Sequence, residues 1–316
     1  MDTPLISAIV VSYNEAEYLQ HAIESILNQD YGSIELIIGD DGSSDGSIEI
    51  IEEYHLKNTE RIKYFVMPRD EEMKNIIPSI RVSNVIKKAF EIARGEYFCV
   101  LSGDDYFTDM HHFSNDIKCL EENKDIVSIA GGYAKVYPDG TEERILDSTP
   151  FPWFWGGRYL HVSCYTFRKV VLNNILERFC DDTGLIYSVL CSGNIMYSNE
   201  ISFAYRQREK SIMHEARTTE LYLLETLLFQ DCINYGQFKF FSYARIYKPY
   251  HYLYKNSDNL SGYEKYIKAS SRCSNDFIKD LVKSKTDKIA GMKVKLNIIR
   301  FFICWFIVHV YYRINK

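Results

Sequence analysis

The sequence predicts an α/β protein with a mostly parallel, Rossmann-like sheet flanked by helices and a helical extension at its C-terminus. In the first half of the chain, short runs rich in β-branched residues alternate with longer stretches of helical period, which is typical of successive βαβ units. From about Thr218 onward the pattern is helical and rich in tyrosine. With 316 residues, 46% of them apolar, the chain can bury a core.

The first half predicts four strands with helices between them. Leu5–Ser12 is the first strand, and Asn14 is placed to cap the helix Glu15–Asn28, with Glu17 completing a capping box. The same alternation then continues. It gives a strand at Ile34–Gly39, a helix ending near His55, a strand at Arg61–Met67, a helix at Arg81–Ala93 and a strand at Glu96–Leu101.

The second half changes character after about residue 130. Tyr137–Thr141 carries the turn residues of a hairpin, and residues 150–157 are too rich in Pro, Gly and aromatic residues for a regular element. We expect helices at Phe167–Phe179 and Thr183–Cys191 and a strand near Ile201–Tyr205. The expected organisation is therefore a first half-domain at 1–130, a second at 131–217 and a helical region at 218–316.

Composition excludes several classes of protein. The chain has 37 basic and 43 acidic residues, a net charge of −6 and no Lys/Arg block longer than two, so nucleic acid is not an expected partner. The eight cysteines are scattered without a C-x-x-C pair, which indicates reduced thiols. The N-terminal residues lack the basic start and cleavage site of a signal peptide, so we expect a cytoplasmic protein.

Polar side chains follow the predicted strands at the points where they end. Tyr13, Asp41 and the pair Asp104-Asp105 follow the first, second and fourth strands, and Arg81 begins the helix after the third. Ligands of open parallel sheets bind at the carboxyl ends of the strands. Tyr13 is suited to stack on a base, Asp41 to accept its N–H, and the Asp pair to hold a hard divalent cation against phosphate oxygens.

Alternative readings of these residues remain. The segment from Asp41 to Glu52 nearly fits a calcium loop, but a β-branched strand enters it where an EF-hand requires a helix. Both acidic runs are also compatible with solvated loops that cap the next helix. Neither a P-loop nor a G-x-G-x-x-G motif is present, so phosphates held without a glycine cradle need a metal.

Five segments together resemble the family 2 glycosyltransferases of the GT-A fold. They read SAIVVSYNE from Ser7, SILNQDY from Ser25, ELIIGDDGSSDGS from Glu35, ARGEY from Ala93 and SGDDYF from Ser102. Later in the chain, Cys180-Asp181-Asp182 and YRQREKSIM from Tyr205 resemble the family's acidic base motif and a following basic segment. The resemblance ends before the last 80 or so residues.

The resemblance implies a nucleotide-sugar donor site, a divalent metal and a catalytic base. Tyr13 and Asp41 would hold the base of the donor, Arg81 would reach its diphosphate, and Asp105 would bind Mn2+ or Mg2+. The family's D-x-D signature reads Ser-Gly-Asp-Asp here, so its first carboxylate is absent. The other implied donor residues are Val11, Asn14, Asp104, Arg206 and Arg208, and His214 is a candidate second metal ligand.

Two further groups complete the implied reaction. An inverting transfer needs a base opposite the leaving diphosphate, and Asp182 fills that position, with Asp181 as the alternative. One of the two also suits a helix N-cap. Trp153 and Trp155 are candidates for stacking on an acceptor sugar, with ordinary core packing as the alternative.

The C-terminal segment predicts contact with a membrane. Phe301–Tyr312 is strongly apolar and basic residues precede it, which favours a segment lying in the membrane interface over a helix packed on the domain or a dimer contact.

The expected function is a metal-dependent inverting transfer of a hexose (glucose, galactose or N-acetylhexosamine) from a UDP-sugar to a saccharide on undecaprenyl diphosphate. Among bacterial relatives this belongs to O-antigen, capsule or exopolysaccharide assembly at the inner face of the cell membrane. The alternative is a non-catalytic nucleotide-sugar or carbohydrate-binding module on the same scaffold. A sugar nucleotidyltransferase is disfavoured because Ser12-Tyr13-Asn14 supplies no glycine-rich basic loop.

Overall fold

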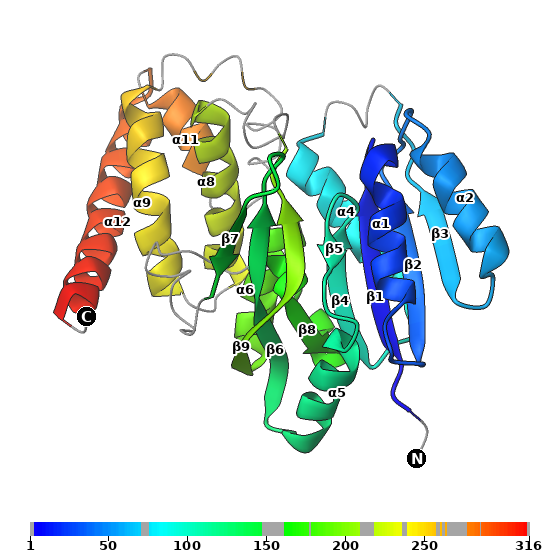
Figure 1. Ribbon diagram of the computed structural model, residues 1–316. Coiled ribbons are helices and arrows are strands. Elements are labelled where there is room, and N and C mark those ends of the chain that lie inside the picture. The colour runs from blue at the N-terminus through cyan, green and yellow to red at the C-terminus, as the bar shows by residue number, and fades with distance from the viewer. Residues whose placement is uncertain are drawn as a thin grey trace. The chain divides into compact units, whose positions relative to one another are not determined.

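A computed structural model describes residues 3–70, 76–146, 161–176, 178–208, 218–235, 239–256, 260, 263, 277–284 and 286–314. The chain divides into two compact units (Figure 1). The first comprises Met1–Pro150 and Tyr159–Arg208, and the second comprises Phe151–Arg158 and Glu209–Lys316.

The described part of the first unit contains one mixed sheet of nine strands. Their order is β3-β2-β1-β4-β8-β6-β9-β5, with β7 paired to β6. The β3-β2-β1-β4 half is parallel, β8 is antiparallel to both β4 and β6, and β9 is parallel to β6. The strands are β1 (Ile6–Ser12), β2 (Ile34–Asp40), β3 (Ile62–Val66), β4 (Tyr97–Ser102), β5 (Tyr106–Phe107), β6 (Ile126–Val136), β7 (Glu142–Ile145), β8 (Tyr165–Arg168) and β9 (Asn194–Arg206).

The central parallel strands are buried on both faces and end at one edge of the sheet. All seven residues of β2 are buried, as are six of the seven in β1, because helices cover both faces of a parallel sheet. In the register of the sheet, Ser12 lies opposite Asp40, and Val11 lies opposite Ser102. The polar residues that follow these strands therefore emerge together, as the sequence predicts.

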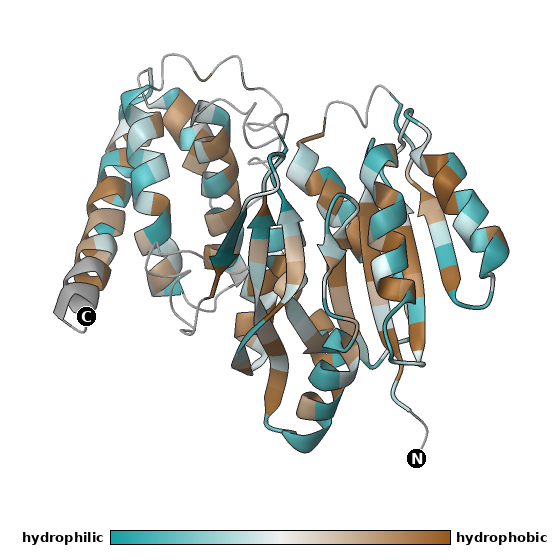
Figure 2. Ribbon diagram, in the orientation of Figure 1, coloured by the Kyte–Doolittle hydropathy of each residue, from teal (hydrophilic) through white to brown (hydrophobic). Residues whose placement is uncertain are grey.

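Helices pack on the sheet in the order that right-handed crossovers require. The chain runs outward from β1 to β3 and then returns to β4, so α1 and α2 lie on one face and α4 on the other (Figure 1). The α-helices described in this unit are α1 (Ala16–Leu27), α2 (Ser47–Lys57), α4 (Pro78–Ile92), α5 (His112–Glu122) and α6 (Asp182–Ser192). Figure 2 shows the apolar strands of the sheet between helices whose outer sides are hydrophilic.

The cap of α1 differs from the prediction. The N-cap residue is Glu15, and no side chain of that position bonds the helix. Ser47 Oγ instead accepts the Glu15 N–H at 3.0 Å, and an Asp45 carboxylate oxygen accepts the Ala16 N–H at 3.0 Å. The loop after β2 thus satisfies the helix start, because the parallel register places it beside that start.

The helix predicted at Phe167–Phe179 is also wrong. Tyr165–Arg168 forms β8, followed by a 3-10 helix at Lys169–Asn174. Tertiary context overrides the local pattern here, since β8 fills the position between β4 and β6. By contrast, the Tyr137–Thr141 hairpin, the helix near Thr183–Cys191 and the strand near Ile201–Tyr205 are confirmed.

The described part of the second unit is helical, as its sequence predicts. Its described helices are α8 (Thr218–Tyr235), α9 (Lys239–Lys255), α11 (Phe277–Lys283) and α12 (Lys288–Ile314). Aromatic residues hold them together: Phe301 of α12 stacks on Tyr243 of α9 and meets Phe277 of α11 edge-on. Within the described residues, no helix has the length and apolar character needed to span a bilayer.

A buried carboxylate ties the amino ends of the central strands together. Glu35 of β2 accepts the Ser7 hydroxyl at 2.6 Å, the Arg94 backbone N–H at 2.5 Å and the Lys63 ammonium at 3.1 Å. Ser7 in turn accepts the Gly95 N–H, and a Cβ at Gly95 would lie 2.5 Å from the Ser7 oxygen. Burial alone would raise the pKa of Glu35, but these bonds outweigh it and lower that pKa to about 2.

We predict that Glu35 makes stability depend on acid. Because its folded pKa lies below its unfolded value, its contribution is complete above the unfolded pKa and is lost as pH falls toward about 2. The shift corresponds to roughly 3 kcal/mol. Denaturant unfolding should show that Glu35→Gln lowers the free energy of unfolding at pH 7 and flattens its decline between about pH 5 and pH 2. A matched control is Glu53→Gln, which removes an exposed pair with Lys57; an equal effect of both changes would contradict the prediction.

Candidate active site

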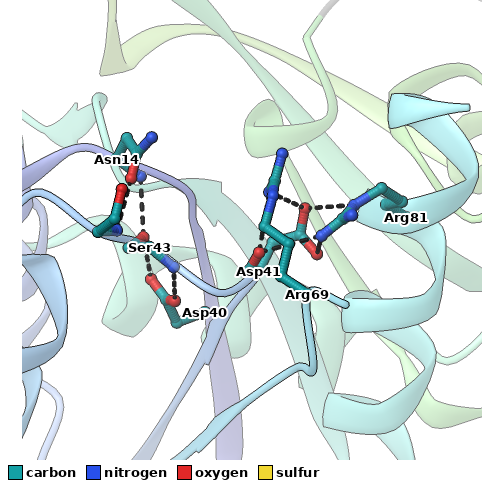
Figure 3. Close-up of polar contacts among 7 residues, drawn as sticks. Asn14, Asp40, Asp41, Ser43, Arg69 and Arg81 are labelled. Carbon is teal, nitrogen blue, oxygen red and sulfur yellow. Dashed lines mark hydrogen bonds and ion pairs between the residues drawn. The ribbon is translucent and has the colours of Figure 1, made fainter. Parts of the chain in front are cut away.

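Asp41 is held by two arginines at the end of β2 (Figure 3). Arg81 of α4 binds it with both arms of its guanidinium, Nε to Oδ2 at 2.8 Å and Nη2 to Oδ1 at 2.5 Å. Arg69 donates to Oδ2 at 3.2 Å and to the Asp41 carbonyl at 3.0 Å. Asp41 and Arg81 are buried, so the pair forms a rigid, desolvated floor for this part of the site.

The Arg81 guanidinium pairs with the Asp41 carboxylate. Its contact with a donor diphosphate stays a prediction. The Arg69 guanidinium also lies 3.6 Å from the centre of the Tyr13 ring. Arg69 was missed by the sequence analysis, because it follows β3 in a loop without a motif. It is the cation that joins Tyr13 to Asp41.

Asn14 lies in a turn that locks two loops together (Figure 3). Its φ of +53° is in the left-handed region that Asn tolerates. Its N–H donates to Ser43 Oγ at 2.9 Å, and its Oδ1 accepts the Ser44 N–H at 2.9 Å. Asp40 accepts both the Ser43 N–H and the Ser43 hydroxyl. In the structure, Asn14 therefore orders the loops after β1 and β2.

Three buried carboxylates, from Glu15, Asp104 and Asp105, gather where β1 and β4 end. Arg208 pairs with Asp104 at 2.5 Å and lies 3.6 Å from Glu15. Gly103 makes the close approach possible, since a Cβ there would lie 2.4 Å from a Glu15 carboxylate oxygen. Burial raises the pKa of Glu15 well above its ordinary value, and the charge of Asp104 raises it further.

Asp105 is the most enclosed member of this acidic cluster. Its Oδ1 accepts the Arg206 backbone N–H at 2.9 Å, whereas its Oδ2 is buried without a hydrogen-bond partner in the described part of the chain. Burial, Asp104, Glu15 and Asp182 all raise the pKa of Asp105. An orphaned buried carboxylate oxygen beside other carboxylates fits a divalent cation.

The described residues can be tested for a complete set of metal ligands. Within the ranges that the structure describes, no three His, Cys, Asp or Glu side chains are arranged to hold a metal ion. Mg2+ and Mn2+ sites of nucleotide-binding proteins often take one or two carboxylates and complete the shell with phosphate and water. The donor set here fits that mode, with Asp105 and Asp104 as the protein ligands.

Arg206 is the last residue of β9. Its guanidinium contacts a backbone carbonyl and neighbouring rings, and not the carboxylate oxygens of the acidic cluster. Nη1 donates to the Asp104 carbonyl at 2.8 Å, and the guanidinium lies 4.6 Å from the centre of the Tyr106 ring. Its remaining arm lies 2.6 Å from His21 Nδ1. Arg206 thus fixes the main chain of the acidic cluster, while Arg208 faces its carboxylates.

Asp181 and Asp182 begin α6 and have different surroundings. Asp181 is the N-cap, accepting the Gly184 N–H at 3.3 Å. Burial and the neighbouring charge of Asp182 raise the pKa of Asp181 to about 7. The Asp182 side chain is 45% exposed, and its charge acts on Asp105. The N-cap role predicted for one of the two therefore falls to Asp181, which leaves Asp182 available to a ligand.

His161 and Tyr205 border Asp182, and the sequence analysis identified neither as a site residue. His161 Nε2 lies 3.5 Å from Asp182 Oδ2. His161 Nδ1 accepts the Ser163 N–H at 3.3 Å, so the proton of a neutral ring is on Nε2, the nitrogen near Asp182. The imidazole stacks on the rings of Phe203 and Tyr205.

Burial, Asp105, Asp182 and Asp104 all raise the pKa of Tyr205.

The predicted site residues are therefore brought together in part. The charges of Asp104 and Asp182 act on Asp105, and all three carboxylates act on Tyr205. Val11 lies beside them, because its carbonyl accepts the Gly103 N–H at 2.8 Å. Trp153, Trp155 and His214 lie outside the described residues.

Comparisons with known proteins identify the family. Residues 7–190 match the family model for glycosyl transferase family 2. An uncharacterized glycosyltransferase of Haemophilus influenzae is 32% identical over 149 residues, which cover 47% of this chain and 55% of that protein. The chain spans between 55% and 66% of the length of the first curated relatives that it matches.

Solved structures confirm the fold class. Staphylococcus aureus TarS, residues 1–349, in complex with UDP-GlcNAc covers 99% of this chain and 92% of its own, with a TM-score of 0.59 and 17% identity. A mannosyltransferase of Pyrobaculum calidifontis in complex with GDP-Man and Mn2+ covers 98% and 88%, with a TM-score of 0.56 and 13% identity. At these identities the likeness concerns the fold, which is the predicted GT-A type. With the family model matching more than half of its length, this chain belongs to glycosyl transferase family 2.

Proposed function

We propose that this protein is a metal-dependent inverting glycosyltransferase that moves a hexose from a UDP-sugar to a hydroxyl of a saccharide. One observation carries the proposal: Asp182, a half-exposed carboxylate, lies close enough to the buried acidic cluster for its charge to act on Asp105, although the two come from different parts of the chain. A cation-binding carboxylate and a separate base are the two groups that such a transfer requires.

The loops after β1 and β2 form the nucleotide end of the proposed site. Tyr13, Asn14, Asp41 and Val11 lie there, and the Arg81–Asp41 pair keeps the loop rigid. Arg69, 3.6 Å from the Tyr13 ring and in contact with Asp41, is a further cation at this end. TarS was solved with UDP-GlcNAc and the Pyrobaculum enzyme with GDP-Man, so their structures support a nucleotide-sugar donor, and we propose uridine.

The acidic cluster forms the metal and diphosphate end. Bound Mn2+ or Mg2+ would neutralise the charge that develops on the departing nucleoside diphosphate. Asp105 and Asp104 would hold that cation, and His214 is the candidate further ligand. Arg208, which pairs with the Asp104 carboxylate, and Arg206, which donates to the Asp104 carbonyl, would contact the diphosphate.

Asp182 performs the proton transfer in this proposal. As the acceptor oxygen forms its bond to C1 of the sugar, the bond from C1 to the diphosphate oxygen breaks and Asp182 takes the hydroxyl proton. Attack opposite the leaving group inverts the anomeric configuration. His161 Nε2, 3.5 Å from Asp182 Oδ2, would position the carboxylate, and Trp153 and Trp155 are the candidate platform for the acceptor sugar.

We propose further that the acceptor saccharide is carried on undecaprenyl diphosphate, with a glucose, galactose or N-acetylhexosamine transferred during O-antigen, capsule or exopolysaccharide assembly. The supporting observation is α12, whose exposed apolar and basic residues suit contact with the inner face of the cell membrane. A lipid-linked acceptor would be presented at that surface.

Separate substitutions of Asp182 and Asp181 test which of the two is the catalytic base. Asp182→Asn should lower kcat for transfer by about 10²- to 10⁴-fold while donor affinity, measured by calorimetry, stays within a few fold. Asp181→Asn is the matched control, because Asn caps a helix as well as Asp does. If only Asp181→Asn abolishes transfer, the base is misassigned. If neither change affects turnover, the transfer uses another mechanism. If no transfer occurs with any donor, the chain is a binding module.

Replacing Asp105 tests the metal site. Asp105→Asn keeps the acceptor for the Arg206 N–H but removes the charge, so Mn2+ binding in the presence of UDP should fall at least tenfold by calorimetry, and transfer should fall with it. The melting temperature in excess chelator should equal or exceed that of the unchanged protein, because an uncompensated buried carboxylate is destabilising. Full transfer activity in excess chelator would refute the metal requirement.

His161 can be tested with two substitutions that separate the role of its Nε2–H beside Asp182 from the packing of its ring. His161→Phe keeps a ring between Phe203 and Tyr205 but has no donor, whereas His161→Gln retains a donor near Nε2. We expect His161→Phe to reduce kcat about tenfold with little change in the donor KM, and His161→Gln to restore part of it. Equal loss in both variants, or a change confined to KM, would argue against a positioning role.

A further inference from the structure

Helix α12 exposes a continuous apolar stripe along its length. The residues are spaced alternately three and four apart, which places them on one side of the helix. Their side chains are between 51% and 65% exposed. The apolar stripe consists of Ile289, Met292, Leu296, Ile299, Ile303 and Phe306, with Phe302 and Ile307 exposed beside it.

The opposite side of α12 is already used for packing within the second unit. Ala290, Val294, Phe301, Cys304 and Val308 are buried there. Figure 1 shows α12 beside α9 and α11, which supply the partners of this buried side. More than half of each side chain in the apolar stripe is therefore exposed, and burying this surface elsewhere would be favourable.

Basic side chains border the apolar stripe on both sides. At 3.6 residues per turn, Lys293 and Arg300 lie along one border, and Lys288 and Lys295 lie along the other. All four residues are exposed. The sequence of α12 contains no Asp or Glu, although the whole chain has a net charge of −6. Positive charge is thus concentrated beside exposed apolar surface.

Charge decides between the two occupants that such a stripe could take. Its three-four spacing would suit a coiled coil with the α12 of a second copy. Stable coiled coils place opposite charges beside the seam, whereas Lys293, Lys295 and Arg300 would meet like charges from an identical helix. An anionic surface satisfies both the apolar stripe and its basic borders.

We propose that α12 binds the surface of an anionic lipid bilayer, lying in the plane of the interface with its apolar stripe among the acyl chains. The bordering lysines extend their alkyl stems along the stripe and place their charges on lipid phosphates, whereas the Arg300 guanidinium lies 4.0 Å from the centre of the Tyr243 ring of α9. This inference assigns the partner surface for the membrane contact under the proposed function, and it does not depend on the transfer chemistry.

Vesicle co-sedimentation of the full chain tests the surface without any turnover. The chain should bind phosphatidylglycerol vesicles, bind phosphatidylcholine vesicles more weakly, and lose affinity as salt increases. Leu296→Glu and Ile303→Glu should each reduce binding at least tenfold, and Lys293→Gln should reduce binding to phosphatidylglycerol vesicles about fivefold. Leu56→Glu is the matched control, since Leu56 on α2 is 76% exposed and should not affect binding.

Measurements of folding and of activity distinguish a loss of vesicle binding from a loss of the fold or of the transfer reaction. Circular dichroism should be unchanged in each variant, because the replaced side chains are exposed, and transfer to a soluble saccharide acceptor should persist in Leu296→Glu. Absence of binding to phosphatidylglycerol vesicles, or binding by Leu296→Glu equal to that of Leu56→Glu, would overturn the inference. A concentration-dependent dimer that Leu296→Glu dissociates would overturn it as well, by assigning the stripe to a second copy.

Discussion

The burial of like charges at one edge of the sheet is the constraint on which the rest of the site depends. Glu15, Asp104 and Asp105 converge where β1 and β4 end, and Arg208 is the side-chain cation paired with two of them in the described residues. Burial raises the pKa values of Glu15 and Asp105, so the cluster is held together against its own electrostatics. The proposed divalent cation would relieve this repulsion.

The loops around this edge are rigid because each is bonded by another loop. The segment after β2 caps α1 through Asp45 and Ser47, closes on Asn14 through Ser43, and is clamped at Asp41 by Arg81. Such cross-bonding prepares the site before a ligand arrives, which avoids an ordering penalty on binding. The membrane-facing role proposed for α12 is a separate matter of surface chemistry in the second unit.

Several parts of the site were predictable because they follow strands in recognisable segments. Tyr13, Asp41, Asp104 and Asp105 were placed correctly at the carboxyl edge, since parallel strands in register end together. Roles were harder to predict than positions. Asn14 suits a helix cap by its local sequence, yet the structure places it in an inter-loop turn, because a better-placed acceptor arrives from Asp45.

The sequence by itself determined the parallel sheet, the positions of its strand ends, the acidic pairs and the helical C-terminal unit, because these depend on local periodicity and on short motifs. Only the tertiary structure decided the partners: Arg69 on Tyr13, Arg81 on Asp41, and His161 on Asp182. It also decided that Tyr165–Arg168 is a strand. These outcomes rest on contacts between residues far apart in the chain, which no local pattern encodes.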